Sequence, residues 1–110
     1  MKTEVVHAAD ATIVRMIGTL DMSTCSGVEA MLTSLLDSGT RKMVLNFADV
    51  DFVSSAGLRV LISTAKKLSS QGGGLRLCSL REQVQLVFDI AGLNAVIPTM
   101  ADEAGATANF

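Results

Sequence analysis

The chain has 110 residues, the usual size of one domain, and 49% of them are apolar, which is enough for a buried core and excludes a disordered chain. The net charge of −2, with no basic tract beyond the pair Lys66-Lys67, argues against nucleic-acid binding. No apolar run approaches the roughly 20 residues that cross a membrane, which argues against direct membrane insertion.

The first two predicted elements are strands, at Thr3–Ala8 and Thr12–Ile17. Only three residues separate them, so the simplest connection between them is an antiparallel hairpin. The segment from Gly18 to Met22 is then expected to leave the sheet.

The first predicted helix begins near Ser23, Thr24 or Ser26, and residues Ser26–Glu29 have the pattern of a capping box. Its apolar stripe consists of Val28, Met31, Leu32, Leu35 and Leu36. Gly39 is suited to the left-handed position that ends a helix.

A nearly continuous apolar run at Met43–Phe47 predicts a central strand, followed by a second helix. The apolar residues of this helix recur at helical spacing: Leu58, Leu61, Ile62, Ala65 and Leu68. Counting back from them, the helix begins near Ser55, with Ser54 or Ser55 as its N-cap.

The start of this second helix is the most informative place in the chain. Its first backbone N–H groups lack partners within the helix, and the helix dipole is positive there, so an anion such as phosphate is tolerated. A serine hydroxyl at this position is also exposed enough for a kinase to reach. From spacing alone, a plainer interpretation stays open, in which Ser54 and Ser55 are only caps.

The C-terminal third predicts a turn at Gln71–Gly74, a strand at Leu75–Cys78 and a third helix that starts with a capping box at Ser79–Glu82 and stops at Gly92. A short fifth strand is predicted at Val96–Ile97. The segment from Thr99 to Asp102 is a candidate cap for a last helix.

These elements predict one α/β domain over residues 1–110. The sheet is mixed and mainly parallel, with four to five strands and an N-terminal hairpin. Three to four helices are expected to pack mainly on one of its faces.

Most catalytic chemistry is unsupported by the residues present. A serine nucleophile needs a base, and the only histidine, His7, lies in the first predicted strand. GxSxG, P-loop and metal-ligand spacings are all absent. Asp21, and the pair Asp49 and Asp51, are better explained by loop hydrogen bonding and solvation than by Mg²⁺ binding. We therefore expect a protein that is not an enzyme and has no cofactor.

The cysteines Cys25 and Cys78 form no CxxC motif, and the N-terminus lacks the apolar core of a signal peptide. We expect reduced thiols and a cytoplasmic location.

Residues Phe52–Leu58, FVSSAGL, resemble the signature loop of STAS domains, in particular the bacterial anti-sigma factor antagonists. Four more segments resemble the family in the same order: Gly18–Asp21 (GTLD), Gly72–Leu77 (GGGLRL), Phe88–Leu93 (FDIAGL) and Val96–Pro98 (VIP). The ordered set covers roughly residues 12–98 and is far more specific than any one segment.

The resemblance implies a switchable binding protein. Ser55 aligns with the serine that a partner kinase phosphorylates, and Ser54, the second choice, stands where the antagonists usually have Asp. The implied partners are an anti-sigma factor with serine-kinase activity and a PP2C-like phosphatase. The residues expected to bind the partner are Asp21, Ser54, Ser55, Ala56, Gly57, Arg59 and Ser63.

Two alternatives stay open at this point. One is a constitutive STAS module that serves as a scaffold subunit of a transport or signalling complex, in which Ser55 is never phosphorylated. The other is a sensor that binds a small ligand through the loops at the end of the sheet.

Overall fold

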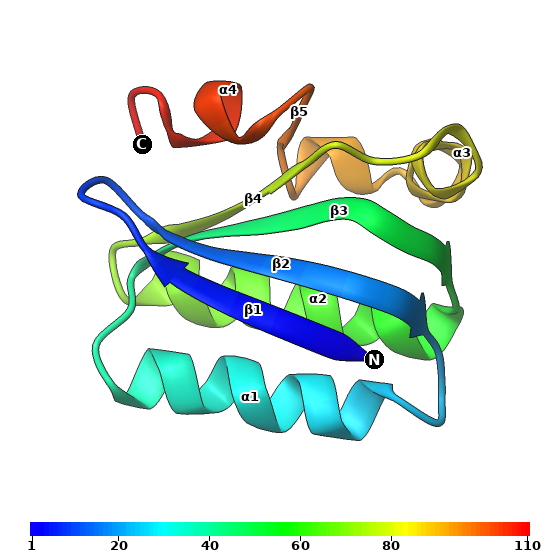
Figure 1. Cartoon of the computed structure of the whole chain (residues 1–110), viewed down its shortest axis with the longest axis horizontal. Helices are drawn as coiled ribbons and strands as arrows, with labels where there is room; N and C mark the ends of the chain where they lie inside the picture. Colours follow the sequence, from blue (N-terminus) through cyan, green and yellow to red (C-terminus); the bar gives the residue numbers. More distant parts are fainter.

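Five strands form one sheet in the computed structural model, which describes residues 1–110. The strands are β1 (Lys2–His7), β2 (Thr12–Leu20), β3 (Lys42–Val53), β4 (Gly74–Cys78) and β5 (Thr99–Met100), and they lie in the sheet in that order. The helices are α1 (Cys25–Asp37), α2 (Ser55–Ser70), α3 (Glu82–Ala91), the 3-10 turn η1 (Leu93–Ala95) and α4 (Glu103–Thr107). Figure 1 shows their arrangement.

The predicted hairpin and mixed sheet are confirmed. β1 and β2 pair antiparallel, from Lys2 opposite Ile17 to His7 opposite Thr12, while β2, β3, β4 and β5 run parallel to their neighbours. The Ala8 N–H donates to the Ala11 carbonyl at 2.9 Å and closes the hairpin.

β2 and β3 extend further than predicted. The sequence predicts that the segment from Gly18 to Met22 leaves the sheet, but its first three residues stay paired with β3, in which Leu20 lies opposite Val53. The register between these strands shifts twice, between Arg15 and Ile17 and between Gly18 and Thr19, and the pairing continues after each shift. The polar residues that resemble a loop, such as Asp49 and Asp51, are exposed positions of β3.

The main core lies between one face of the sheet and the helices α1, α2 and α3. It contains 21 buried residues, most of them aliphatic. The one aromatic pair is edge-to-face, with the rings of Phe47 and Phe88 centred 6.4 Å apart. In Figure 1, α1 and α2 run side by side below the strands. The predicted packing of helices mainly on one face is confirmed.

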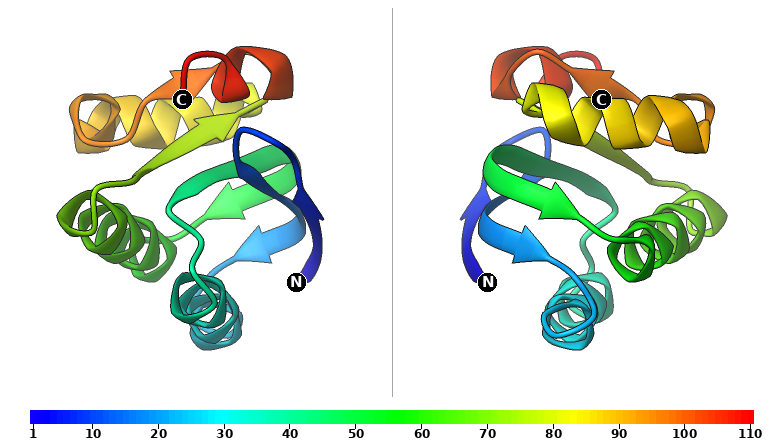
Figure 2. Two further views of the ribbon diagram at one scale, coloured as in Figure 1. Left: turned by 90° about the vertical axis from the view of Figure 1, so that its left-hand side faces the viewer. Right: turned by 90° about the vertical axis from the view of Figure 1, so that its right-hand side faces the viewer.

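A smaller cluster covers the opposite face of the sheet under α4. It consists of Ala11, Ile13, Val44, Cys78 and Ala106. Glu103 of α4 accepts hydrogen bonds from the Arg15 guanidinium at 2.9 and 3.0 Å and from the Asn46 amide at 2.6 Å. Figure 2 shows α4 on the side of the sheet away from α1 and α2.

Two predicted capping boxes are wrong. Ser26 lies inside α1, whose N-cap is Thr24, and α3 starts after Arg81 rather than at Ser79. The Ser79 backbone adopts a φ of 61° and its hydroxyl donates to the Ala101 carbonyl, so this residue turns the chain out of β4 instead of capping a helix.

The predicted strand at Val96–Ile97 is also wrong, because the 3-10 turn η1 occupies the preceding residues and β5 forms three residues later, at Thr99–Met100. Asp102 caps α4, and its carboxylate accepts from the Gly105 N–H at 2.8 Å. None of the helices combines the length and apolar character needed to span a membrane.

Candidate functional site at the start of α2

The site forms where β2 and β3 end, because parallel neighbours finish at the same edge of a sheet. A hydrogen bond joins the last residue of β2 to the residue that follows β3: the Ser54 N–H donates to the Leu20 carbonyl at 2.9 Å. Asp21 follows Leu20 in the chain, so the turn after β2 lies beside the serine loop.

Ser54 is the N-cap of α2. Its backbone is extended, and its hydroxyl oxygen accepts from the Gly57 N–H at 3.3 Å. The sequence left open whether Ser54 or Ser55 caps the helix, and the structure assigns this role to Ser54. An Asp at this position would cap about equally well.

Ser55 is the first residue of α2 and is exposed. No hydrogen bond within the protein engages its hydroxyl, whereas the Ser54 hydroxyl is held by the helix cap. The unpaired first-turn N–H groups and the positive end of the helix dipole surround Ser55. Its hydroxyl is therefore free to react and stands where added negative charge is tolerated.

Gly57 lets α2 approach β2 closely. A Cβ atom built on Gly57 would lie 2.7 Å from Leu20 Cγ and 2.9 Å from the Leu20 carbonyl oxygen. The sequence suggested Gly57 only through the family resemblance, and the structure supplies a steric reason for it. The neighbouring Ala56 is half-buried.

Asp21 shapes the turn between β2 and α1. Its carboxylate accepts from the Ser23 N–H at 2.9 Å and from the Ser23 hydroxyl at 2.6 Å. These hydrogen bonds, with smaller contributions from Thr24, lower the pKa of Asp21 below its usual value. Asp21 thus has the loop-bonding role considered from the sequence, and contact with a partner stays a prediction for it.

The outward face of α2 continues from Ser55 through Arg59 and Ser63, which follow at intervals of four residues. Arg59 is exposed and Ser63 is half-buried. These two residues line a shallow hollow of about 370 Å³ together with Ile62, Lys66 and Lys67.

Other polar groups nearby are paired with each other. Asp51 accepts from the Thr19 hydroxyl at 2.7 Å, and Asp49 lies 3.8 Å from the Arg81 guanidinium. No group of three or more His, Cys, Asp or Glu side chains is placed to hold a metal ion.

The family model of the STAS domain matches residues 2–106. This chain belongs to the STAS domain family.

Two relatives extend the comparison. BtrV of Bordetella bronchiseptica is 37% identical to this STAS domain over 93 residues, covering 84% of this chain and 80% of BtrV. The anti-sigma-B factor antagonist of Bacillus subtilis is 32% identical over 92 residues, covering 84% of each chain. The relatives of this STAS domain thus include anti-sigma factor antagonists.

The fold also matches a solved structure. The Bacillus cell fate determinant SpoIIAA superimposes in its phosphorylated form with a TM-score of 0.73 and 17% identity, covering 94% of this chain and 96% of SpoIIAA. The unphosphorylated form gives a TM-score of 0.74.

Sequence reasoning missed several surface features of this STAS domain. Met22 and Phe52 are 81% and 51% exposed beside the serine loop, and neither has a periodicity that marks it as outward-facing. Lys66 and Lys67 are not among the missed residues: they are exposed and extend the α2 face beyond Ser63, on the side opposite the apolar stripe, as the helical spacing predicts.

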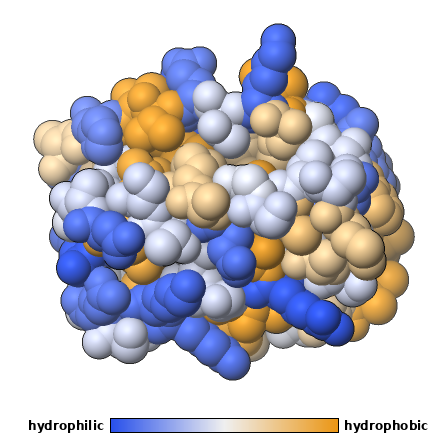
Figure 3. All heavy atoms as spheres, turned by 90° about the horizontal axis from the view of Figure 1, so that it is seen from below, coloured by the Kyte–Doolittle hydropathy of each residue, from blue (hydrophilic) through white to orange (hydrophobic).

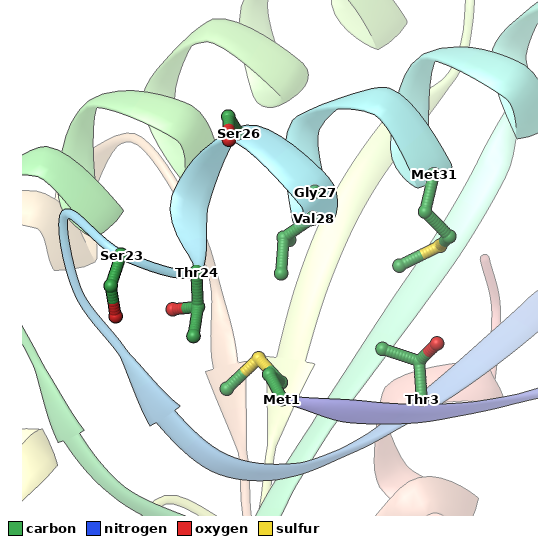
Figure 4. A pocket seen from close by; sticks show the side chains of 8 residues that line it. All are labelled: Met1, Thr3, Ser23, Thr24, Ser26, Gly27, Val28 and Met31. Carbon is green, nitrogen blue, oxygen red and sulfur yellow. The ribbon is translucent and has the colours of Figure 1, made fainter.

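A second hollow, of about 430 Å³, opens between the start of β1 and α1. In Figure 4, Met1, which precedes β1, and Thr3 of β1 lie across from Val28 and Met31 of α1. Thr24 lies toward one end of the hollow. No charged side chain lines this hollow.

Proposed function

We propose that this STAS domain is an anti-sigma factor antagonist. Its unphosphorylated form binds an anti-sigma factor with serine-kinase activity and frees the sigma factor. Phosphorylation of Ser55 ends the binding, and a PP2C-like phosphatase restores the hydroxyl. The kinase holds ATP and Mg²⁺ on its own side.

The observation that carries the proposal is the exposed, unpaired hydroxyl of Ser55 at the start of α2. The neighbouring Ser54 is already engaged as the helix cap, so Ser55 is the better acceptor for a phosphate. The names of the antagonist relatives support the antagonist role, and the phosphorylated form of SpoIIAA supports a switch by phosphorylation.

The proposed role is binding rather than catalysis. His7 pairs with Thr12 at the start of β2, while Ser55 lies beyond the other end of that strand. At about 3.3 Å per residue, the length of β2 separates them by roughly 26 Å. The imidazole therefore lies far outside the reach of a general base for Ser55.

The energies associated with the phosphate charge indicate that phosphorylation affects partner binding rather than the stability of the fold. Phosphate adds about −1.5 to −2 charges, which the N-terminus of a helix stabilises by about 0.3–1 kcal/mol. The fold should therefore persist. In a docked interface the same charge must lose its water, which costs several kcal/mol when unpaired, and every 1.4 kcal/mol or so lowers affinity tenfold.

The residues expected to form the contact surround Ser55. Asp21 presents the turn beside the loop, and Arg59 and Ser63 continue the outward face of α2. The half-buried Ala56 belongs to the first turn, and the buried Gly57 contributes by fixing that turn against Leu20. Ser54 holds the loop in shape through its cap.

The test uses anti-sigma factor kinases from the same genome with ATP and Mg²⁺, followed by peptide mass spectrometry and binding measurements. We expect one phosphate, on Ser55, with loss of binding. Ser55→Ala should bind constitutively, and Ser55→Asp should fold normally but bind at least about tenfold more weakly.

Ser54→Ala is the matched control. It should lose about 0.5–2 kcal/mol of stability with its helix cap but still accept phosphate on Ser55. Phosphate on Ser54 alone, or kinase binding by Ser55→Asp as tight as wild type, would contradict the proposed switch. A stable complex with another partner and no phosphate from any kinase would point to the constitutive scaffold.

A further inference from the structure

Positive charge is concentrated in one segment of this otherwise acidic chain. Residues 52–81 contain five Lys and Arg residues and no Asp or Glu, whereas the other residues contain four basic and eleven acidic side chains. Three of the five, Arg59, Lys66 and Lys67, are exposed on α2. Helix α2 is therefore a cationic element in a protein of net charge −2.

These three cations are not neutralised within the protein. The ion pairs of the structure join Arg15 to Glu4 and Glu103, and Arg81 to Asp49. The α2 cations instead surround a shallow hollow of about 370 Å³ that also contains the half-buried Ile62 and Ser63. Figure 3 looks onto the face formed by α1 and α2, where hydrophilic side chains surround smaller apolar areas.

We infer that this cationic face of α2, formed by Arg59, Lys66 and Lys67 around Ile62, docks an acidic segment of the kinase partner. The inference rests on the proposed function and names the chemistry of the partner surface: Asp or Glu side chains around one apolar residue that covers Ile62. Complementary charges across an interface steer association and fix its register.

The face is continuous with the phosphorylation site. Arg59 follows Ser55 by four residues, so the two side chains are neighbours on the helix surface. A phosphate on Ser55 places about −1.5 to −2 charges at the end of a face that holds three positive charges. It repels the acidic segment and competes with it for Arg59.

A lipid surface is the less favoured occupant. Lipid-binding clusters contain about four to eight basic residues, and each adds about 1 kcal/mol near an anionic membrane. The α2 face has three.

The experiment measures association and dissociation rates with the anti-sigma factor kinase at about 50 and 200 mM salt. Lys66→Glu is compared with Lys2→Glu, an equal charge change at an exposed position on β1. We expect Lys66→Glu to lower the association rate about tenfold at the lower salt, with a smaller effect at the higher salt. Lys2→Glu should stay within about twofold of wild type, and circular dichroism should show both variants folded.

Each contrary outcome is distinguishable. Equal rates for Lys66→Glu and Lys2→Glu, with Ser55→Asp still weakened, would overturn the docking surface and leave the proposed switch intact. If wild type binds no such kinase, the proposed function fails and this inference fails with it. Capture on phosphatidylserine vesicles that Lys66→Glu abolishes, with kinase rates unchanged, would overturn the acidic partner in favour of lipid.

Discussion

At the scale of single residues, the site depends on a close approach between the end of β2 and the first turn of α2. Gly57 is buried against Leu20, and the backbone of Ser54 donates to the Leu20 carbonyl. The exposed hydroxyl of Ser55 is thus held on a rigid support, although Ser55 itself contacts little. The conformation of Ser55 is set by its neighbours Ser54, which caps the helix, and Gly57, whose lack of a side chain lets the first turn pack against Leu20.

Gly57→Ala should destabilise the protein by about 1–3 kcal/mol, because the added Cβ lies within 3 Å of Leu20 side-chain and backbone atoms. The matched control is Gly27→Ala on α1, where a Cβ meets nothing within 4 Å. That variant should gain about 0.5–1 kcal/mol from helix propensity. Urea unfolding measures both changes, and equal stabilisation of the two would show that α2 does not need the close approach.

At the scale of elements, α2 and α4 are anchored by different forces. Helix α2 packs into the main core through an apolar stripe, whereas the five-residue α4 is too short to be stable alone. Glu103 joins α4 to the sheet through Arg15 and Asn46. This ionic contact makes the attachment of α4 dependent on pH.

Arg15, followed by Asn46, lowers the pKa of Glu103 below its ordinary value of 4.5. A lowered folded-state pKa stabilises the protein above the ordinary value, and this contribution is lost as pH falls through the folded-state pKa. Glu103→Gln should therefore lower stability at pH 7 and flatten the pH dependence below about 4.5. Asp21 and Asp89, whose pKa values are also lowered, should keep part of that dependence.

Unfolding curves at pH 7 and in acid, with hydrogen exchange of the α4 amides, test this expectation. Glu29→Gln, an exposed change on α1 with no ion pair, is the control. An identical acid response of the Glu103 and Glu29 variants would mean that the contact adds nothing to stability.

At the scale of the whole molecule, the sheet separates a large aliphatic core from a small one. A domain of this size has about 5–15 kcal/mol of net stability, so one central side chain accounts for a substantial fraction of it. Phe47 is fully buried against Phe88 in the large core. Phe52, five residues later on the same strand, is 51% exposed.

Phe47→Ala should cost about 3–5 kcal/mol, because it removes buried apolar surface and leaves a cavity. Phe52→Ala should cost less than about 1 kcal/mol, since half of its side chain already contacts water. Denaturant midpoints compare the two variants directly. Similar losses would mean that Phe52 is held in the fold more firmly than its exposure indicates.

The order and type of most elements were predictable because they follow from local patterns. The stripe from Leu58 to Leu68 predicts α2, and the short spacing after Ala8 predicts the hairpin. Gly92 ends α3 as predicted, and the structure shows that it does so in the left-handed conformation. The serine loop could also be placed at a helix start, and the STAS resemblance to Phe52–Leu58 indicated its role.

The local patterns gave wrong predictions where a segment forms hydrogen bonds with residues that are distant in the sequence. Asp49 and Asp51 resemble a loop, but pairing with β2 makes them strand. Ser79 resembles a cap, but its positive φ turns the chain out of β4, and its hydroxyl donates to the carbonyl of Ala101, the residue after β5.

The sequence by itself determined the α/β class, the aliphatic core and the position of the serines before α2, because short-range periodicity and capping chemistry set these features. Only the tertiary structure decided that Ser54 is engaged while Ser55 is free, that Gly57 must lack a side chain, and that Arg59, Lys66 and Lys67 form one unpaired cationic face. Each of these features depends on which residues far apart in the sequence come into contact in the fold. A parallel sheet brings together strand ends that are far apart in the chain.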